Sequence, residues 1–317
     1  MNNLKYAIMF AGQGSQHVGM VQDVYFGNPK VQHFFERAEL ITSKPLMKYM
    51  FGGPDEVLKQ TNITQPCLLT ANVSLFETFI EKTNSLPTYV CGHSAGEYAA
   101  LYAADVLSFD DALKLIAYRG ELMNSMGAGS MLAILNATEE EVNSLCCKAA
   151  VEGGILTPAN WNSEKQTVIS GDIASIDNAL ELAFDLNITA IPLPVSGAFH
   201  SKLMIPVIAK FERYLKEVTF NNSKQHIIAN TIAQPISFSE HWKSTVVEQI
   251  VSPVKWKQTI QYLYEQGVNI FIEIGPGNVL SKLVSKDYPD VTVLTVNDME
   301  SIEHTTQYLN NIVLEKV

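Results

Sequence analysis

Thr88-Tyr-Val-Cys-Gly-His-Ser-Ala-Gly-Glu-Tyr-Ala-Ala-Leu (88–101) has the pattern of a strand that turns directly into a helix. A β-prone run meets Gly-x-Ser-x-Gly at residues 92–96, and an Ala-rich helical run continues to Leu107. This pattern is typical of a nucleophile elbow. Gly92 and Gly96 are expected because side chains beside the strained serine would clash, and the Ser94 hydroxyl would lie at a helix N-terminus that favours negative charge. The alternative is a turn with a capping serine, but the flanking strand and helix favour a nucleophile.

The composition is that of a globular protein without a nucleic-acid or membrane-binding surface. The 317 residues are 47% hydrophobic and 17% charged, which suits one or two domains with a large core. The net charge of −11 argues against nucleic acids and anionic membranes as partners. The N-terminal apolar run is too short for a signal peptide, and no run approaches the ~20 residues of a membrane span. We therefore expect a cytoplasmic protein.

The cysteines give no sign of a metal or disulfide site. They form no C-x-x-C pair and have no histidine at the spacing that zinc ligands adopt. We expect no metal, and reduced, buried thiols at Cys67, Cys91, Cys146 and Cys147.

Strands alternate with helices along most of the chain, which predicts a mostly parallel sheet covered on both faces. Ligands of such sheets bind at the carboxyl ends of the strands, and the glycine-bearing loops at 11–17 and 92–96 leave such ends. Between residues 130 and 195 the order is β-α-β-β-α-β, which is typical of a ferredoxin-like unit. The predicted fold class is therefore α/β, with a core formed by residues 1–127 and 197–317 and an inserted ferredoxin-like subdomain at 128–196.

Arg119 lies in the middle of an apolar helical face. Its neighbours three and four positions away are Leu115, Ile116, Leu122 and Met123. A buried arginine needs an anion, because an unpaired buried charge is costly. An internal carboxylate and a bound ligand are equally compatible with the sequence at this point.

His200 lies in the loop 195–201, where the predicted subdomain rejoins the core. A lone histidine is more often a surface or core residue than a catalyst. This one follows glycine and alanine at a subdomain boundary, and such boundaries commonly form the edge of a cleft. His200 is therefore a candidate site residue.

Several motifs occur in order along the chain: Gly12-Gln-Gly-Ser-Gln, Gly92-His-Ser-Ala-Gly-Glu, Arg119, Ala159-Asn-Trp-Asn-Ser, Ala198-Phe-His-Ser, and Gln249 followed by Ser252-Pro-Val-Lys-Trp. With them the sequence resembles malonyl-CoA:acyl carrier protein transacylases over nearly its whole length. The resemblance implies an α/β-hydrolase-like core with a parallel sheet and a ferredoxin-like insert, in agreement with the order of elements. Within the family, residues 119–123 and 195–201 are most similar to the discrete, trans-acting acyltransferases of polyketide synthases.

The resemblance implies a double displacement through a malonyl-serine ester. Ser94 would attack the thioester of malonyl-CoA while His200 takes its proton. The backbone N–H groups of Gln13 and Ala95 would hold the oxyanion. In the family a backbone carbonyl orients the base, and the matching residue here is Gln249. The phosphopantetheine thiol of an acyl carrier protein would then receive the malonyl group.

The resemblance also implies the substrate contacts. Arg119 would bind the free carboxylate of malonate through two parallel hydrogen bonds. Phe199 suggests malonyl rather than methylmalonyl as the acyl group. The other expected contacts are His93, Met123, Asn160 and Asn162, with the asparagines on the pantetheine. No cofactor is expected besides the substrate malonyl-CoA, and the chain is expected to act as a monomer.

Other functions are compatible with some of these motifs and candidate site residues. A housekeeping malonyl transacylase of fatty-acid synthesis would share the motifs. An acyl hydrolase that clears carrier proteins would use Ser94 and His200, but hydrolytic relatives typically lose the carboxylate clamp, so Arg119 argues against it. A non-catalytic docking subunit would not need the complete set of Ser94, His200, Arg119 and Gln249.

Overall fold

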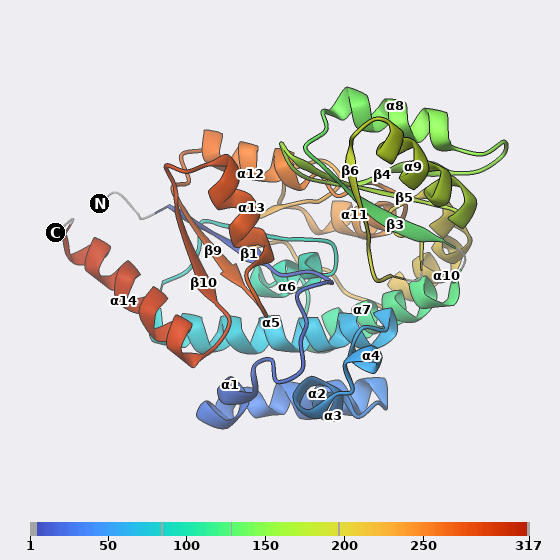
Figure 1. Cartoon of the computed structure of the whole chain (residues 1–317). Coiled ribbons are helices and arrows are strands. Elements are labelled where there is room, and N and C mark those ends of the chain that lie inside the picture. Colours follow the sequence, from blue (N-terminus) through green and yellow to red (C-terminus); the bar gives the residue numbers. More distant parts are fainter. Residues whose placement is uncertain (1–4, 84, 128, 196, 316–317) are drawn as a thin grey trace.

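Two β-sheets, one mostly parallel and one antiparallel, organise the chain (Figure 1). The computed structural model describes residues 5–83, 85–127, 129–195 and 197–315. The larger sheet contains β1 (Tyr6–Phe10), β2 (Tyr89–Gly92), β7 (His226–Ile228), β8 (Pro235–Ile236), β9 (Ile270–Ile274) and β10 (Thr292–Val296). Their spatial order is β10-β9-β1-β2-β7-β8, and every neighbouring pair is parallel except β7 and β8. The predicted α/β class with a parallel sheet is confirmed.

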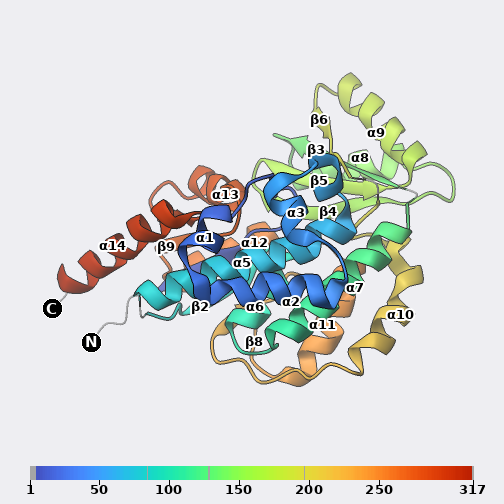
Figure 2. The same ribbon diagram turned by 90° about the horizontal axis from the view of Figure 1, so that it is seen from below.

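Helices cover both faces of the larger sheet (Figures 1 and 2). One group comprises α5 (Thr61–Thr83), α6 (Gly96–Ala103), α7 (Phe109–Ser125) and α14 (Met299–Glu315), and the other comprises α12 (Trp256–Glu265) and α13 (Val279–Asp287). Alternate residues of β1 divide between them: Ile8 belongs to the apolar core of the first group, and Met9 to that of the second. Both side chains are fully buried. This two-sided burial explains why β1 is an uninterrupted apolar run.

A further layer of helices lies beyond α5 (Figures 1 and 2). It contains α1 (Gln22–Gly27), the 3-10 helix η1 (Pro29–Val31), α2 (Gln32–Thr42), α3 (Leu46–Gly52) and α4 (Asp55–Leu58). Elsewhere the 3-10 helix η2 (Lys202–Met204) precedes α10 (Ile205–Leu215), which packs against α7 and α11 (Ser239–Val251). None of the helices in the described ranges is both long and apolar enough to cross a membrane.

The antiparallel sheet follows the predicted β-α-β-β-α-β order. Its elements are β3 (Ser130–Leu135), α8 (Glu139–Ala149), β4 (Leu156–Ser163), β5 (Gln166–Gly171), α9 (Ile173–Asp185) and β6 (Thr189–Pro192), with the strand order β4-β5-β3-β6. Leu132 and Ile134 of β3 pack with α8 and α9, whereas Ala133 faces the other side. The domain limits at 127–128 and 196–197 stay a prediction, and residues 128 and 196 lie outside the described residues.

The antiparallel sheet is joined to the core through β4. Val254, in the segment before α12, donates its N–H to the carbonyl of Ala159 and accepts from the N–H of Trp161, both at 2.9 Å. The segment thus runs parallel to β4 for a short distance, with Asn160 paired to Val254. These bonds fix Asn160 and its neighbours relative to the larger sheet.

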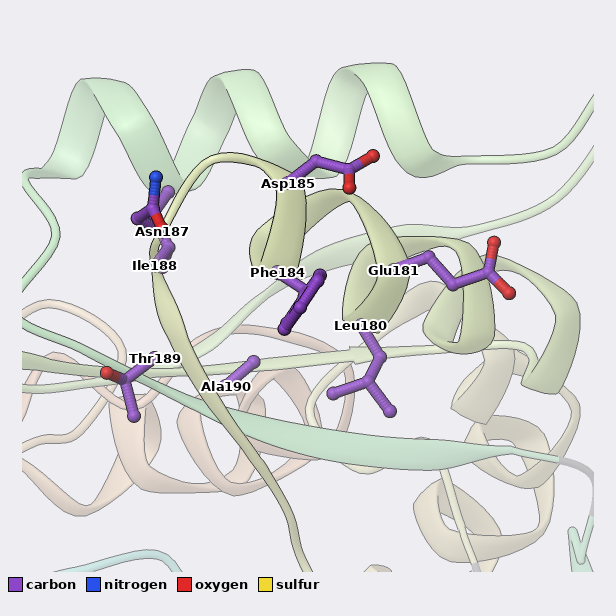
Figure 3. A pocket seen from close by; sticks show the side chains of 8 residues that line it. All are labelled: Leu180, Glu181, Phe184, Asp185, Asn187, Ile188, Thr189 and Ala190. Carbon is purple, nitrogen blue, oxygen red and sulfur yellow. The ribbon is translucent and has the colours of Figure 1, made fainter.

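An open groove with both polar and apolar lining lies on the outer side of the antiparallel sheet (Figure 3). Its lining residues come from α9, β6 and the turn between them: Leu180, Glu181, Phe184, Asp185, Asn187, Ile188, Thr189 and Ala190. Phe184 is 83% exposed. In Figure 1, α9 lies on the side of this sheet away from the larger sheet, so the groove is remote from the elbow after β2.

One prediction about the cysteines is wrong. Cys67, Cys91 and Cys146 are buried as predicted, but Cys147 is exposed. Cys146 and Cys147 are consecutive on α8, and consecutive helical residues point about 100° apart. Because Cys146 faces the sheet, Cys147 faces away from it.

The turn from β2 into α6 requires glycine on both sides of Ser94. A Cβ on Gly92 would lie 2.1 Å from the carbonyl of Gly96, and a Cβ on Gly96 would lie 2.2 Å from the carbonyl oxygen of Phe10. Ser94 itself has a φ of 51°, in the left-handed region. The close approach of α6 to β1 and β2 therefore produces the predicted elbow.

Gly96→Ala should destabilise the fold, since the added Cβ meets main-chain atoms that cannot move independently. Overpacking of this kind typically costs about 1–3 kcal/mol, occasionally more. The free energy of unfolding from urea denaturation measures the loss. Gly52→Ala is the matched control, because a Cβ there meets nothing within 4 Å. Equal stability of the two variants would contradict the close approach.

Candidate active site

Ser94 is held in its strained conformation by Asn230, which lies just after β7. The Oδ1 of Asn230 accepts the N–H of Ser94 at 2.8 Å, and its Nδ2 donates to the carbonyl of Gly92 at 2.7 Å. Strained backbone persists only where its surroundings fix it, and such positions cluster at functional sites. The bonds to Asn230 supply that restraint on both sides of the turn, so the Ser94 hydroxyl has a fixed direction.

His200 faces this hydroxyl and is 4% exposed. Its Nε2 lies 2.7 Å from Ser94 Oγ, and its Nδ1 lies 2.7 Å from the main-chain oxygen of Gln249. A carbonyl oxygen can only accept, so Nδ1 carries the proton and Nε2 accepts from the serine hydroxyl. Burial, with the positive charge of Arg119, lowers the pKa of His200 from 6.5 to about 3. The imidazole is therefore neutral near pH 7 and able to take a proton.

Arg119 reaches Ser94 from α7 and is fully buried. Its Nη2 donates to Ser94 Oγ at 3.2 Å and to Gln249 Oε1 at 3.0 Å. Its Nε and Nη1 are buried without a hydrogen-bond partner among the described residues. Within the same part of the chain, no carboxylate forms an ion pair with it. The internal ion pair left open by the sequence is thus not found there, and buried donors remain for a ligand anion.

Glu97 and Asn230 were not predicted as site residues. Glu97 lies in the first turn of α6, is fully buried, and accepts from the Asn230 N–H at 2.7 Å and from Gln249 Nε2 at 2.6 Å. Its position in the elbow motif, as an acid among small and apolar residues, was a usable signal. Asn230 gave no signal beyond its place after the β-prone run His226-Ile-Ile-Ala.

The N–H groups of Gln13 and Ala95, predicted as oxyanion donors, follow neighbouring parallel strands. Gln13 comes after β1, and Ala95 comes after β2 at the start of α6. In the ranges that the structure describes, neither N–H donates to a protein acceptor. The side chain of Gln13 donates to Thr61 Oγ1 at 3.2 Å, which ties the loop to α5. Both donors are thus available near Ser94 for an added negative charge.

A cavity of about 230 Å³ lies between the loop after β1, the antiparallel sheet and α13. Predicted site residues in its lining are Gln13, His93, Asn160 and Asn162. His93 Nε2 lies 2.8 Å from Asn162 Oδ1, and burial lowers the pKa of His93, so the neutral ring donates this bond. The lining also includes apolar side chains of β3, β5 and α13. The cavity therefore offers amide groups and apolar surface next to the elbow.

Met123 and Phe199 do not line this cavity. Both are buried, at 1% and 6% exposure. Met123 lies one turn after Arg119 on α7, where its sulfur accepts from Gln65 Nε2 at 3.7 Å. Phe199 directly precedes His200. The structure thus places them beside Arg119 and His200 rather than along the cavity.

Comparison with known proteins identifies the family. Residues 8–310 match the acyl transferase domain family. The chain belongs to this family. This chain is 38% identical over 303 residues to the malonyl CoA-acyl carrier protein transacylase of Staphylococcus aureus strain MRSA252. The match covers 94% of this chain and 97% of the relative.

Solved structures have the same fold as this acyl transferase. The malonyl CoA-acyl carrier protein transacylase of Coxiella burnetii is 35% identical with a TM-score of 0.92, covering 96% of this chain and 97% of that one. A malonyl-transacylase in complex with its type II polyketide synthase acyl carrier protein is 33% identical with a TM-score of 0.92, covering 96% and 99%. These values support the two-sheet architecture over almost the whole chain.

The described part of the acyl transferase contains no recognisable metal-binding site. No group of three or more His, Cys, Asp and Glu side chains able to hold a metal ion occurs there. The expectation that the enzyme needs neither metal nor cofactor stays a prediction.

His200 should remain neutral far below the ordinary range of histidine. Because its pKa is lowered to about 3 in the fold but is 6.5 when exposed, the unfolded chain binds the proton first. Stability should therefore fall as the pH drops from about 6.5 towards 3. An NMR titration of the ring, assigned with His200→Gln, should show no protonation down to about pH 5. A midpoint between about pH 6 and 7 would contradict this account.

Proposed function

We propose that this acyl transferase moves a malonyl group from malonyl-CoA to the phosphopantetheine thiol of an acyl carrier protein, through an ester on Ser94. The main evidence for this proposal is the buried Arg119 guanidinium, which lies beside the Ser94 hydroxyl. Its Nε and Nη1 have no hydrogen-bond partner in the described residues. A short acyl group that ends in a carboxylate supplies the missing acceptor. Relatives named malonyl CoA-acyl carrier protein transacylase support the same substrate.

In the first half-reaction Ser94 Oγ attacks the thioester carbonyl and its proton passes to His200 Nε2. The N–H groups of Gln13 and Ala95 stabilise the oxyanion of the tetrahedral intermediate, and losing one such donor typically costs about 10²–10³ in rate. The bond from Nδ1 to the Gln249 carbonyl keeps the ring oriented. The resulting imidazolium is strongly acidic because of its burial, so it readily protonates the departing CoA sulfur.

In the second half-reaction the pantetheine thiol of a carrier protein takes the place of CoA. His200 accepts the thiol proton, the thiolate attacks the malonyl ester, and the proton returns to Ser94 Oγ as the ester bond breaks. The amides of Asn160 and Asn162 in the cavity wall are suited to the amide groups of the pantetheine arm. One cavity can serve both half-reactions, since CoA and the carrier protein present the same arm.

Arg119 provides acyl selectivity in this proposal. Malonate gives the guanidinium a planar partner, whereas acetate leaves it buried and unpaired, which costs roughly 2–5 kcal/mol. An acyl hydrolase would use the same serine and histidine, but it has no need of a carboxylate clamp. The buried guanidinium therefore favours malonyl transfer over general acyl hydrolysis.

The biosynthetic pathway that the enzyme supplies with malonyl groups is a separate question. Residues 119–123 and 195–201 favour a discrete, trans-acting enzyme of a polyketide synthase, and one solved relative is in complex with a type II polyketide carrier protein. The general names of the Staphylococcus aureus and Bacillus subtilis relatives fit a housekeeping transacylase better. We also propose that the enzyme acts in the cytoplasm as a monomer. The preferred carrier protein distinguishes the two pathways.

Intact-protein mass spectrometry should detect a malonyl ester on the wild-type chain after malonyl-CoA is added, and none on Ser94→Ala. Subsequent addition of holo-acyl carrier protein should transfer the group, with carriers from fatty-acid and polyketide synthesis compared in parallel. Labelling of Ser94→Ala would mean that another residue is the nucleophile. Release of free malonate with little loading of any carrier would favour the hydrolase.

Arg119→Ala should reduce malonyl transfer far more than acetyl transfer. Loss of a buried charge partner corresponds to about 2–5 kcal/mol, or about 30-fold to several thousand-fold in malonyl acylation rate. Arg119→Lys is the informative companion, because it keeps the charge but cannot form two parallel hydrogen bonds. Rates of Ser94 acylation by the two CoA thioesters measure the effect. Equal losses for both thioesters would remove the proposed role of Arg119.

A further inference from the structure

We propose that Glu97 is a positioning residue that sets acyl selectivity by holding the Gln249 amide with its oxygen toward Arg119. The inference rests on the proposed malonyl transfer, because selectivity is defined by the carboxylate clamp. Glu97 is fully buried and contacts neither Ser94 Oγ nor the cavity. It acts through the residues that it holds.

Gln249 links every part of the site. Its main-chain oxygen accepts from His200 Nδ1, and its Oε1 accepts from Arg119 Nη2 at 3.0 Å. Its Nε2 donates to the carbonyl of Ser94 at 3.0 Å and to Glu97 Oε2 at 2.6 Å. The direction of this amide decides whether Arg119 meets an acceptor or a donor.

Glu97 presents acceptors to both of its neighbours. Oε1 receives the main-chain N–H of Asn230, and Oε2 receives Gln249 Nε2. An ionised carboxylate has no proton to donate, so both contacts are satisfied only in this direction. The Ser94 carbonyl, which also accepts from Gln249, reinforces the same orientation. Because its carboxylate can only accept hydrogen bonds, Glu97 fixes the orientation of the Gln249 side-chain amide.

A neutral side chain at this position cannot satisfy both neighbours. Glutamine would place its NH₂ against either the Asn230 N–H or the Gln249 NH₂. The main-chain N–H of Asn230 is fixed between β7 and the elbow, whereas the Gln249 amide can turn about its last side-chain bond, at the cost of its bond to the Ser94 carbonyl. Rotation would turn the Gln249 NH₂ toward the guanidinium of Arg119 and would remove its acceptor. The clamp for the malonyl carboxylate would then be displaced.

The proposal predicts that Glu97→Gln lowers the ratio of malonyl to acetyl acylation of Ser94 by about 10- to 100-fold, the range of a hydrogen bond to a charged group. The ratio does not depend on the fraction of folded enzyme, so partial unfolding does not disturb it. Glu77→Gln is the matched control. Glu77, on α5, accepts from the Tyr102 hydroxyl at 2.8 Å, and within the described ranges no hydrogen bond joins it to the site residues. This control should keep the wild-type ratio.

Glu97→Asp retains a carboxylate and should recover most of the ratio even if both rates fall. A residue with a merely structural role would lower malonyl and acetyl acylation together in every variant, and this result would overturn the proposal. Loss of the ratio in Glu97→Asp to the same extent as in Glu97→Gln would also overturn it. If the wild-type chain is not labelled by malonyl-CoA at all, the proposed function fails instead.

The wild-type enzyme offers a second test that needs no folded variant. Burial raises the pKa of Glu97 to about 7, with Arg119 and the amide donors opposing the rise. The other titratable groups facing it are Cys91 on β2, Tyr98 on α6 and Arg119 on α7. Burial moves the pKa values of Cys91 and Tyr98 further above neutrality, and His200 titrates near 3.

Protonated Glu97 carries a donor, like glutamine, so the ratio of malonyl to acetyl acylation should fall as the pH drops below about 7. Both CoA thioesters are assayed in the same buffers, which cancels effects on the serine and histidine. A ratio that is constant between about pH 5.5 and 8.5 would overturn the proposal.

Discussion

The buried guanidinium of Arg119 is the constraint on which the site depends. An amide, a hydroxyl and a tyrosine ring 5.9 Å away surround it. No carboxylate in the described residues pairs with it directly, and the buried Glu97 is linked to it only through the Gln249 amide. A permanent positive charge in such a place is costly unless a further anion enters. Burial, reinforced by this charge, lowers the pKa of His200 and keeps the base neutral until substrate arrives. The guanidinium therefore contributes to both selectivity and reactivity.

The fold brings the functional groups together at the carboxyl ends of neighbouring strands. The loops after β1, β2 and β7 lie side by side because the strands are parallel neighbours in the sheet. They contribute Gln13, the elbow and Asn230, while α7 and α11 add Arg119 and Gln249. The antiparallel sheet, tied to Val254 through β4, forms the other wall of the cavity. Each functional group thus comes from an element whose position is fixed by the packing of both sheets.

Much of this arrangement could be predicted where a local pattern has a single physical solution. The elbow needs its flanking glycines. Ser-x-x-Asp is the spacing of a helix start, and the Ser108 hydroxyl accordingly accepts from the Asp111 N–H at 3.1 Å. Long-range pairing was not visible in the same way. Proline commonly begins a helix, but α12 begins at Trp256 rather than at Pro253 because Val254 pairs with β4.

Residues whose role is to hold others were also missed. Asn230 only ends an apolar run in the sequence, and it becomes important when β7 pairs with β2. Glu97 was visible in the motif, but its burial against Gln249 joins residues far apart in the chain.

A crystal structure of the enzyme carrying a malonyl ester on Ser94 tests the central claim most directly. The account predicts that the free carboxylate lies inside the site, with its oxygens within about 2.7–3.2 Å of two guanidinium nitrogens of Arg119. A carboxylate that points into the cavity toward Asn160 and Asn162, with Arg119 still unpartnered, would contradict it.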